Sequence, residues 1–244
     1  MEFDKISIII PTLNEEKLIR QSLNQFDENI KKNFNLEIVV SDGGSKDKTI
    51  ELINGCVDKL LIHKENFKQN ISRGRNQGAL NSLGDVLVFL NADTLISDKN
   101  VFFDNINKIL RDESVIAIAC PVKVFPQEEM LSDKIFHFCY NNYVKILNKF
   151  FMGMGRGECH VVKRDSFLRL GGYNEKLAAG EDFEFYKRIR KNGKIQFMNE
   201  CLIYESPRRY RKFGYLHVFW EWMINSFSIF FFKKSISKDW QEVR

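Results

Sequence analysis

Three clusters of polar residues that could bind a nucleotide or a cation follow apolar runs in the first hundred residues. The clusters comprise Pro11, Thr12, Asn14 and Glu15 after residues 6–10, Asp42 and Gly43 after residues 36–41, and Asn91, Ala92 and Asp93 after residues 85–90. An aspartate in such a position can accept hydrogen bonds from a base or ribose, and the amides of a Gly-Gly-Ser turn can approach a ligand closely. The Asp93 carboxylate can bind a hard divalent cation shared with phosphates. For any one cluster, turn and helix-capping roles explain the residues about equally well.

A fourth group lies at the start of a helix predicted over residues 71–83. Arg73, Arg75 and Asn76 stand there, and guanidinium groups together with free backbone amides favour phosphate at such a position. Taken together, the four groups predict a nucleotide-diphosphate site that needs Mg²⁺ or Mn²⁺.

The elements that must position these residues alternate regularly. Apolar runs at 6–10, 36–41, 59–63 and 85–90 are separated by helical patterns at 18–26, 47–56, 71–83 and 101–110, and residues 115–124 form a further strand-like run. Unbroken apolar strands alternating with helices predict an α/β fold with a mostly parallel sheet covered on both faces. Ligands bind beyond the carboxyl ends of such strands, where the polar clusters fall.

The second half of the chain combines longer helical patterns with short strands. Helices are predicted at 130–151, 164–170 and 181–191, and strands at 160–162, 195–198 and 202–204. Because no Pro/Gly/Ser-rich linker divides the halves, we expect the second half to complete the same sheet. The predicted organisation is a catalytic domain over residues 1–206 and a basic, aromatic helical extension over 207–244.

Five motifs in this order resemble those of family 2 glycosyltransferases with the GT-A fold. They are IIIPTLNEE at 8–16, VVSDGGSKDKT at 39–49, GRNQG at 74–78, FLNADT at 89–94, and LGGYNE at 170–175 followed by GED at 180–182. The similarity runs from about residue 7 to residue 190. It implies an enzyme that transfers a sugar, with inversion, from a nucleotide-diphosphate sugar to a hydroxyl acceptor, with Mn²⁺ or Mg²⁺ as the cofactor.

The resemblance also implies roles for single residues. Pro11, Thr12, Asn14 and Glu15 would line the nucleotide pocket, Asp42 would contact the base, and Asp93 would bind the metal. Asn91 replaces the first aspartate of the usual D-x-D element, which removes a negative charge and is expected to weaken metal binding. Asp182 would be the general base, although Glu181 and Asp182 also fit the acidic enrichment of an ordinary helix start.

Further candidates lie on the acceptor or diphosphate side. Gly157 and Glu158, in the loop from Gly155 to Glu158, are equally consistent with an acceptor contact and with a surface ion pair in a glycine-rich turn. Arg208 and Arg209 can reach a diphosphate or a phosphorylated acceptor, because guanidinium groups suit phosphate.

Charge and aromatic content single out the C-terminal segment. Of the net charge of +5, +4 falls after residue 202, and residues 213–232 hold six Phe, two Trp and one Tyr without Lys, Arg or Asp. His217, Glu221 and Asn225 recur at helical spacing, which predicts one helix with a polar face, lying in a membrane interface. A helix packed on the domain, a homodimer contact and a membrane span are the alternatives. Nucleic acid is excluded as a partner, since these aromatics do not alternate with cations.

The sequence therefore predicts a cytoplasmic enzyme held at the inner face of the cell membrane, with a lipid-linked or glycan acceptor. No secretory signal precedes the first strand, and the five scattered cysteines suit free thiols. Two alternatives stay open. One is a polyprenyl-phosphate sugar synthase, and the other is a silent nucleotide-sugar-binding subunit, suggested by Asn91.

Overall fold

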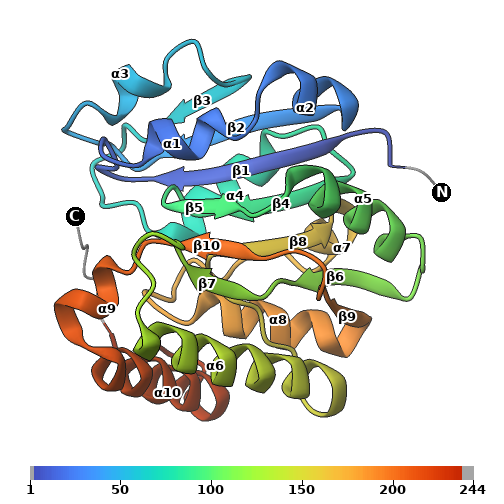
Figure 1. Cartoon of the computed structure of the whole chain (residues 1–244), viewed down its shortest axis with the longest axis vertical. Coiled ribbons are helices and arrows are strands. Elements are labelled where there is room, and N and C mark those ends of the chain that lie inside the picture. Colours follow the sequence, from blue (N-terminus) through green and yellow to red (C-terminus); the bar gives the residue numbers. More distant parts are fainter. Residues whose placement is uncertain (1–2, 238–244) are drawn as a thin grey trace.

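The core of the protein is a seven-stranded mixed sheet, whose strands follow one another from top to bottom of Figure 1. The computed structural model describes residues 3–237. The strands of this sheet, in spatial order, are β3 (Lys59–Ile62), β2 (Leu36–Asp42), β1 (Ile6–Thr12), β4 (Val86–Leu90), β8 (Cys159–Lys163), β6 (Val115–Ala119) and β9 (Lys194–Phe197). Only β8 runs against its neighbours β4 and β6; the other pairs in this sheet are parallel. The predicted α/β fold with a mostly parallel sheet is confirmed.

Helices bury both faces of this sheet, as unbroken apolar strands require. In β1, Ile8 and Ile10 belong to one apolar core and Ile9 to the other. The first core is closed by α1 (Ile19–Asn24), α2 (Glu28–Asn33), α3 (Thr49–Ile53) and α5 (Lys99–Leu110), and the second by α4 (Ile71–Leu80), α6 (Leu131–Phe150), α7 (Arg164–Arg169) and α8 (Glu181–Asn192). Strands of both halves of the chain share one sheet, as expected.

The single strand expected over residues 115–124 is wrong in one respect, because the chain changes sheets within it. Pro121 lacks an N–H group and interrupts the ladder. After it, β7 (Val122–Val124) pairs with β10 (Ile203–Glu205), which also pairs with β5 (Thr94–Ile96) in a small three-stranded sheet. This small sheet ties the segment after Asp93 to the segment before Arg208.

The C-terminal segment contains the helix predicted over residues 213–232, beginning two residues later than predicted, and a short helix before it. Gly214 separates α9 (Arg208–Phe213) from α10 (Tyr215–Phe232). Its φ is +80°, a backbone conformation that an L-residue rarely adopts. The α10 helix lies beside α6 (Figure 1), where the Trp222 ring is 5.4 Å from that of Tyr140. Residues 238–244 of the predicted extension lie outside the described residues.

Candidate functional site

A cavity of about 420 Å³ opens beyond the carboxyl ends of β1 and β4, where the fold class predicts a ligand. Most of the predicted site residues line it. They are Pro11, Thr12, Glu15, Gly43, Asn91, Ala92, Asp93, Gly157, Glu158, Glu181, Asp182, Arg208 and Arg209. The sheet topology explains why the later residues join the earlier ones. Since β8 is antiparallel, its entrance loop lies beside the exit of β4, and the Asn91 N–H donates to the Glu158 carbonyl over 3.2 Å.

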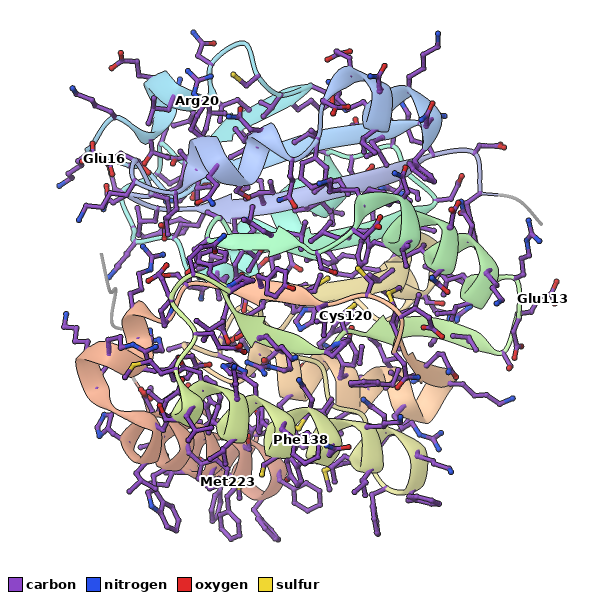
Figure 2. The ribbon with its side chains drawn as sticks, in the orientation of Figure 1. Glu16, Arg20, Glu113, Cys120, Phe138 and Met223 are labelled. Carbon is purple, nitrogen blue, oxygen red and sulfur yellow. The ribbon has the colours of Figure 1, made fainter. Side chains whose placement is uncertain are left out.

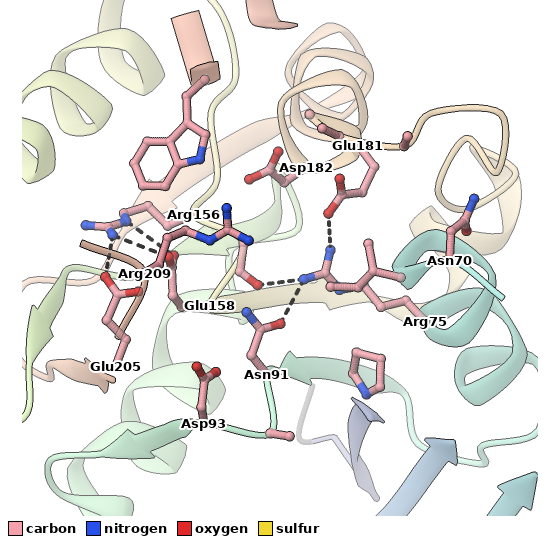
Figure 3. Close-up of a pocket in the computed structure, with 18 of the residues that line it drawn as sticks. Asn70, Arg75, Asn91, Asp93, Arg156, Glu158, Glu181, Asp182, Glu205 and Arg209 are labelled. Atoms are coloured by element: carbon pink, nitrogen blue, oxygen red, sulfur yellow. Dashed lines mark hydrogen bonds and ion pairs between the residues drawn. The ribbon is translucent and has the colours of Figure 1, made fainter. Parts of the chain in front are cut away.

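Arg75 is the buried centre of this cavity wall (Figure 3). Its Nη1 donates to Glu181 Oε1 over 2.8 Å, and its Nη2 donates to Asn91 Oδ1 over 3.1 Å and to the Gly157 carbonyl over 2.6 Å. One guanidinium thus fixes the end of β4, the entrance of β8 and the start of α8 relative to one another. Asn91, where the resemblance led us to expect an aspartate, accepts a hydrogen bond from this cation.

Asp182 lies beside Glu181 at the first turn of α8, on the far side of the cavity from Asp93 (Figure 3). Its Oδ1 accepts a hydrogen bond from the Phe183 amide over 2.7 Å. A Cβ at position 157 would lie 3.4 Å from Oδ2, so Gly157 keeps the space next to this oxygen open. Burial, and then the charge of Glu181, raise the pKa of Asp182 to about 7. A carboxylate with such a pKa is suited to accept a proton near neutral pH.

Asp93 is held by a residue from α9. Arg208 Nη2 lies 3.0 Å from Asp93 Oδ2 and 2.8 Å from Glu15 Oε2. The guanidinium therefore joins Glu15, which lies 193 residues earlier in the chain and just after β1, to Asp93 after β4. Asp93 keeps a partly exposed side chain and opens into the cavity.

Another part of this wall is a buried charge cluster centred on Arg156. The guanidinium contacts both Glu158 and Glu205, at 3.3 Å and 2.9 Å, and its Nη1 lies 3.1 Å from His137 Nδ1. Burial and then the charge of Arg156 lower the pKa of His137 to about 3, so the ring is neutral and accepts this bond. Of the two alternatives for the loop from Gly155 to Glu158, the surface ion pair is wrong in its location: Arg156 and Glu158 do pair, but both are buried.

The pKa values of the two carboxyl groups of this cluster are shifted in opposite directions. Burial disfavours the charged form of Glu158, but the Arg156 guanidinium outweighs this effect and lowers its pKa. Burial and the nearby Glu158 charge raise the pKa of Glu205 well above its ordinary value. The Arg156 cation thus stabilises the carboxylate of Glu158. The Tyr210 hydroxyl donates a hydrogen bond to Glu205 over 2.9 Å.

Four predicted site residues lie outside the cavity lining and bond elsewhere. Asp42 accepts hydrogen bonds from Thr12 and from the turn at residues 44–45, and the Asn14 side chain accepts one from the Lys46 amide. Arg73 faces Glu175 at 3.6 Å, and Asn76 bonds to Tyr173 through both its amide atoms. The contacts predicted between these four residues and the sugar donor remain predictions.

Several residues that sequence reasoning passed over complete the lining. They are Tyr140, Met154, Arg156, Glu205, Tyr210, Trp222 and Asn225. Their signal is weak because they come from five separate segments, and the aromatic and apolar ones among them resemble ordinary core residues. The polar stripe predicted on α10 offered one usable clue. Its members Glu221 and Asn225 point inward, Glu221 toward Arg209 at 3.8 Å, so the stripe marks the face of α10 next to the cavity.

Acidic and basic residues are equally numerous in this lining. Six acidic residues (Glu15, Asp93, Glu158, Glu181, Asp182 and Glu205) face six basic ones (Lys68, Arg75, Arg156, Lys176, Arg208 and Arg209). Within the described residues, no three His, Cys, Asp or Glu side chains converge on a ready-made metal site. Because the pKa of Glu205 is raised well above its ordinary value and that of Asp182 to about 7, these two carboxyl groups are less ionised than the other four, and the lining offers a polyanionic ligand a small surplus of positive charge.

Comparison with known proteins agrees with this geometry. The model of the family described as "Glycosyl transferase family 2" matches residues 7–171, which is more than half of the chain. The chain belongs to glycosyl transferase family 2. This glycosyltransferase is 25% identical over 221 residues to a "Probable glycosyltransferase YdaM" of Bacillus subtilis, an alignment covering 84% of this chain and 51% of the relative.

Two further comparisons extend the assignment. The glycosyltransferase is 27% identical to a Methanococcus voltae enzyme named "Dolichyl N-acetyl-alpha-D-glucosaminyl phosphate 3-beta-D-2,3-diacetamido-2,3-dideoxy-beta-D-glucuronosyltransferase", with 81% of this chain and 65% of the relative covered. The mannosyltransferase PcManGT of Pyrobaculum calidifontis, solved with GDP-Man and Mn²⁺, superposes with a TM-score of 0.64 at 20% identity, covering 83% of this chain and 57% of that one. The GT-A-type fold is thus confirmed. The glycosyltransferase spans about half the length of the curated relatives it matches.

Proposed function

We propose that this glycosyltransferase moves a sugar, with inversion, from a nucleotide-diphosphate sugar to an acceptor hydroxyl in a divalent-cation-dependent reaction. The observation that carries the proposal is the placement of Asp182 and Asp93 on the walls of one cavity. Asp182 has a pKa suited to a base, and Asp93 is paired with Arg208. PcManGT, with which the fold is shared, was solved with a nucleotide sugar and Mn²⁺.

The reaction follows from the positions of these side chains. Asp182 takes the proton of the acceptor hydroxyl, whose oxygen attacks the anomeric carbon from the face opposite the diphosphate. The bond between that carbon and the diphosphate oxygen breaks as the new bond forms, which inverts the configuration. General-base catalysis typically contributes about 10²–10⁴-fold to the rate.

The residues around Asp93 fit a cation that the donor helps to hold. Mg²⁺ and Mn²⁺ are commonly bound by one or two carboxylates and by substrate phosphates. Asp93 supplies one carboxylate, on the same cavity wall as the residues against which we place the donor. When bound, the cation neutralises charge on the leaving diphosphate. To bind the cation, Asp93 must first give up its ion pair with Arg208. The N–H groups of Arg208 can then donate hydrogen bonds to the phosphates.

We place the donor against residues 11–15, Gly43 and residues 91–93, and leave its base and sugar open. The acceptor enters on the side of Gly157, Glu158 and Asp182, which places Arg209 between the two. The Methanococcus relative, by its name, acts on a dolichyl-linked sugar, and this supports a lipid-linked or glycan acceptor here.

We further propose that the enzyme lies on the inner face of the cell membrane through α6 and α10. Apolar side chains project from both helices (Figure 2), and Phe138 on α6 is 70% exposed. On α10 the exposed set comprises Leu216, Trp220, Met223, Ile224, Phe227, Phe230, Phe231 and Phe232. Lys233 and Lys234 follow directly and suit anionic lipid. Among residues 3–237, no helix is both long and apolar enough to cross a bilayer.

A panel of nucleotide sugars tests the proposed function. With Mn²⁺, we expect the release of nucleoside diphosphate from one donor, and its loss after chelation. Turnover unaffected by chelation would remove the cation from the mechanism, and binding without turnover would favour the silent subunit. Flotation with anionic vesicles tests the membrane contact, and a concentration-dependent dimer that leaves vesicles unbound would favour a homodimer on the same face.

A further inference from the structure

A second, apolar cavity of about 230 Å³ lies between α6 and α10. Twelve residues line it, of which eleven are apolar or aromatic: Tyr140, Tyr143, Met152, Met154, Phe183, Phe219, Trp222, Met223, Phe227, Phe230 and Phe231, together with Ser226. Most of its lining comes from α10, and the described residues provide no charged side chain for it. A cavity of this composition suits a hydrocarbon chain.

This apolar cavity adjoins the catalytic one. Tyr140, Met154, Phe183, Trp222 and Ser226 line both cavities. Phe183 directly follows Asp182, so the inner end of the apolar cavity is one residue from the proposed base. A molecule in the apolar cavity can therefore present its head group to Asp182.

The other end of the apolar cavity opens onto the exposed face of α10. Phe227 and Phe231, at 61% and 59% exposure, belong both to its lining and to that face. The Lys187 Nζ lies 3.7 Å from the centre of the Phe230 ring, which places a cation at this rim. A groove with one end at a base and the other at an apolar surface with a cationic rim matches an amphipathic molecule inserted lengthwise.

The start of α8 and α10 are also packed directly together. A Cβ at Gly180 would lie 2.5 Å from Ile229 Cδ1, so a larger residue would force this methyl group to move, and Gly180 has a φ of +75°, which glycine tolerates and L-residues rarely adopt. Ile229 packs with Leu177 and Phe183 in a small apolar cluster around this contact. These contacts therefore fix the position of the groove walls relative to Asp182.

We propose that the α6–α10 groove is the binding site for the hydrocarbon chain of a lipid-linked acceptor, whose head group reaches Asp182. The proposal deepens the proposed function, on which it rests. It assigns the acceptor to the class of molecules with an alkyl or isoprenoid chain joined to a polar head, and it excludes a purely water-soluble glycan as the preferred acceptor.

The test measures binding of short amphiphiles by calorimetry and needs neither donor nor turnover. Two series below their micelle concentrations, n-alkyl β-D-glucosides and n-alkyl phosphates from butyl to octyl, separate hydroxyl heads from phosphate heads. Because a fully buried methylene is worth a roughly fourfold change in affinity, we expect the wild-type dissociation constant to fall about fourfold per methylene in at least one series. A dissociation constant independent of chain length in both series would overturn the proposal.

Matched substitutions locate the binding. Phe227→Glu places a charge in the groove and is expected to abolish the dependence on chain length, with Phe231→Glu as an independent second variant. Leu216→Glu makes the same kind of change on the same helix at an exposed residue outside the groove, and should keep the wild-type dependence. Equal slopes in the two groove variants and the control would overturn the assignment. Loss of nucleotide-sugar turnover would instead contradict the proposed function, which this binding test does not measure.

Discussion

Arg208 holds Asp93 in this structure, with Nη2 at 3.0 Å from Oδ2, and the same nitrogen reaches Glu15. The residue proposed to bind a cation is thus paired with an internal cation before any ligand arrives. Burial disfavours the charged form of Arg208, but Asp93 and Glu15 outweigh this effect and raise its pKa. The guanidinium therefore stays charged and can transfer its hydrogen bonds to a diphosphate.

Arg208→Gln is predicted to lower kcat/KM for donor turnover about 10–100-fold, since hydrogen bonds to charged groups contribute about 1.5–3 kcal/mol. The same change frees Asp93, so the Mn²⁺ concentration for half-maximal activity should not rise. Steady-state kinetics with varied donor and varied Mn²⁺ measure both effects. Lys212→Gln, at an exposed site on the same helix, is the control. Unchanged kinetics in Arg208→Gln would contradict the role of this arginine.

Asn91→Asp is predicted to lower the Mn²⁺ concentration needed for half-maximal activity. A second carboxylate next to Asp93 strengthens the attraction for a hard cation, and Arg75, already 3.1 Å from this side chain, partly neutralises the added charge. Titration of Mn²⁺ at saturating donor gives the value for both proteins. An unchanged or higher requirement in Asn91→Asp would place the cation away from this residue.

Arg156→Gln is predicted to destabilise the fold by about 3–5 kcal/mol at pH 8, because it removes the cation from a buried cluster with two carboxyl groups. The loss should be smaller at pH 5, where Glu158, no longer held ionised by Arg156, takes up a proton. Urea unfolding at the two pH values measures this difference. The double variant Arg156→Gln/Glu158→Gln should regain part of the stability at pH 8, and equal losses at both pH values would contradict the account.

The pKa of Asp182 sets the pH dependence of turnover. Since burial and Glu181 raise it to about 7, the carboxyl is protonated below that pH and cannot accept a proton. We predict that kcat/KM rises about tenfold per pH unit up to pH 7 and then levels off. Rates measured from pH 5 to 9 test this, with Glu184→Gln, on the outer side of the same helix start, as a control for general charge effects. A flat profile down to pH 5 would exclude Asp182 as the base.

The sequence predicted the residues at strand ends well because parallel strands deliver their carboxyl ends to one edge. Asn91, Ala92 and Asp93 reached the cavity for this reason. Asp42 belonged to the same pattern but closes its own turn, and turn-closing and ligand-facing aspartates look alike in a sequence. The predicted roles of both kinds of residue remain to be tested.

The Arg156 cluster could not be predicted, because its members come from α6, the β8 entrance, β10 and α9. Nothing in the spacing of His137, Arg156, Glu205 and Tyr210 indicates that they meet. The break at Gly214 was equally hidden, since a single glycine inside an aromatic run is compatible with a continuous helix until its backbone conformation is known. The inward polar face of α10 was predictable from periodicity, whereas the surface it packs against was not.

The central claim is that Asp182 acts as a base in cation-dependent sugar transfer, and the turnover of Asp182→Asn measured with and without Mn²⁺ tests it most directly. We predict that wild-type protein releases nucleoside diphosphate only with Mn²⁺, and that Asp182→Asn loses about 10²–10⁴-fold in kcat while it binds the nucleotide normally. The variant should be at least as stable as wild type at pH 8, because a carboxyl with a raised pKa costs stability when it ionises. Turnover of Asp182→Asn equal to that of the wild type would contradict the account.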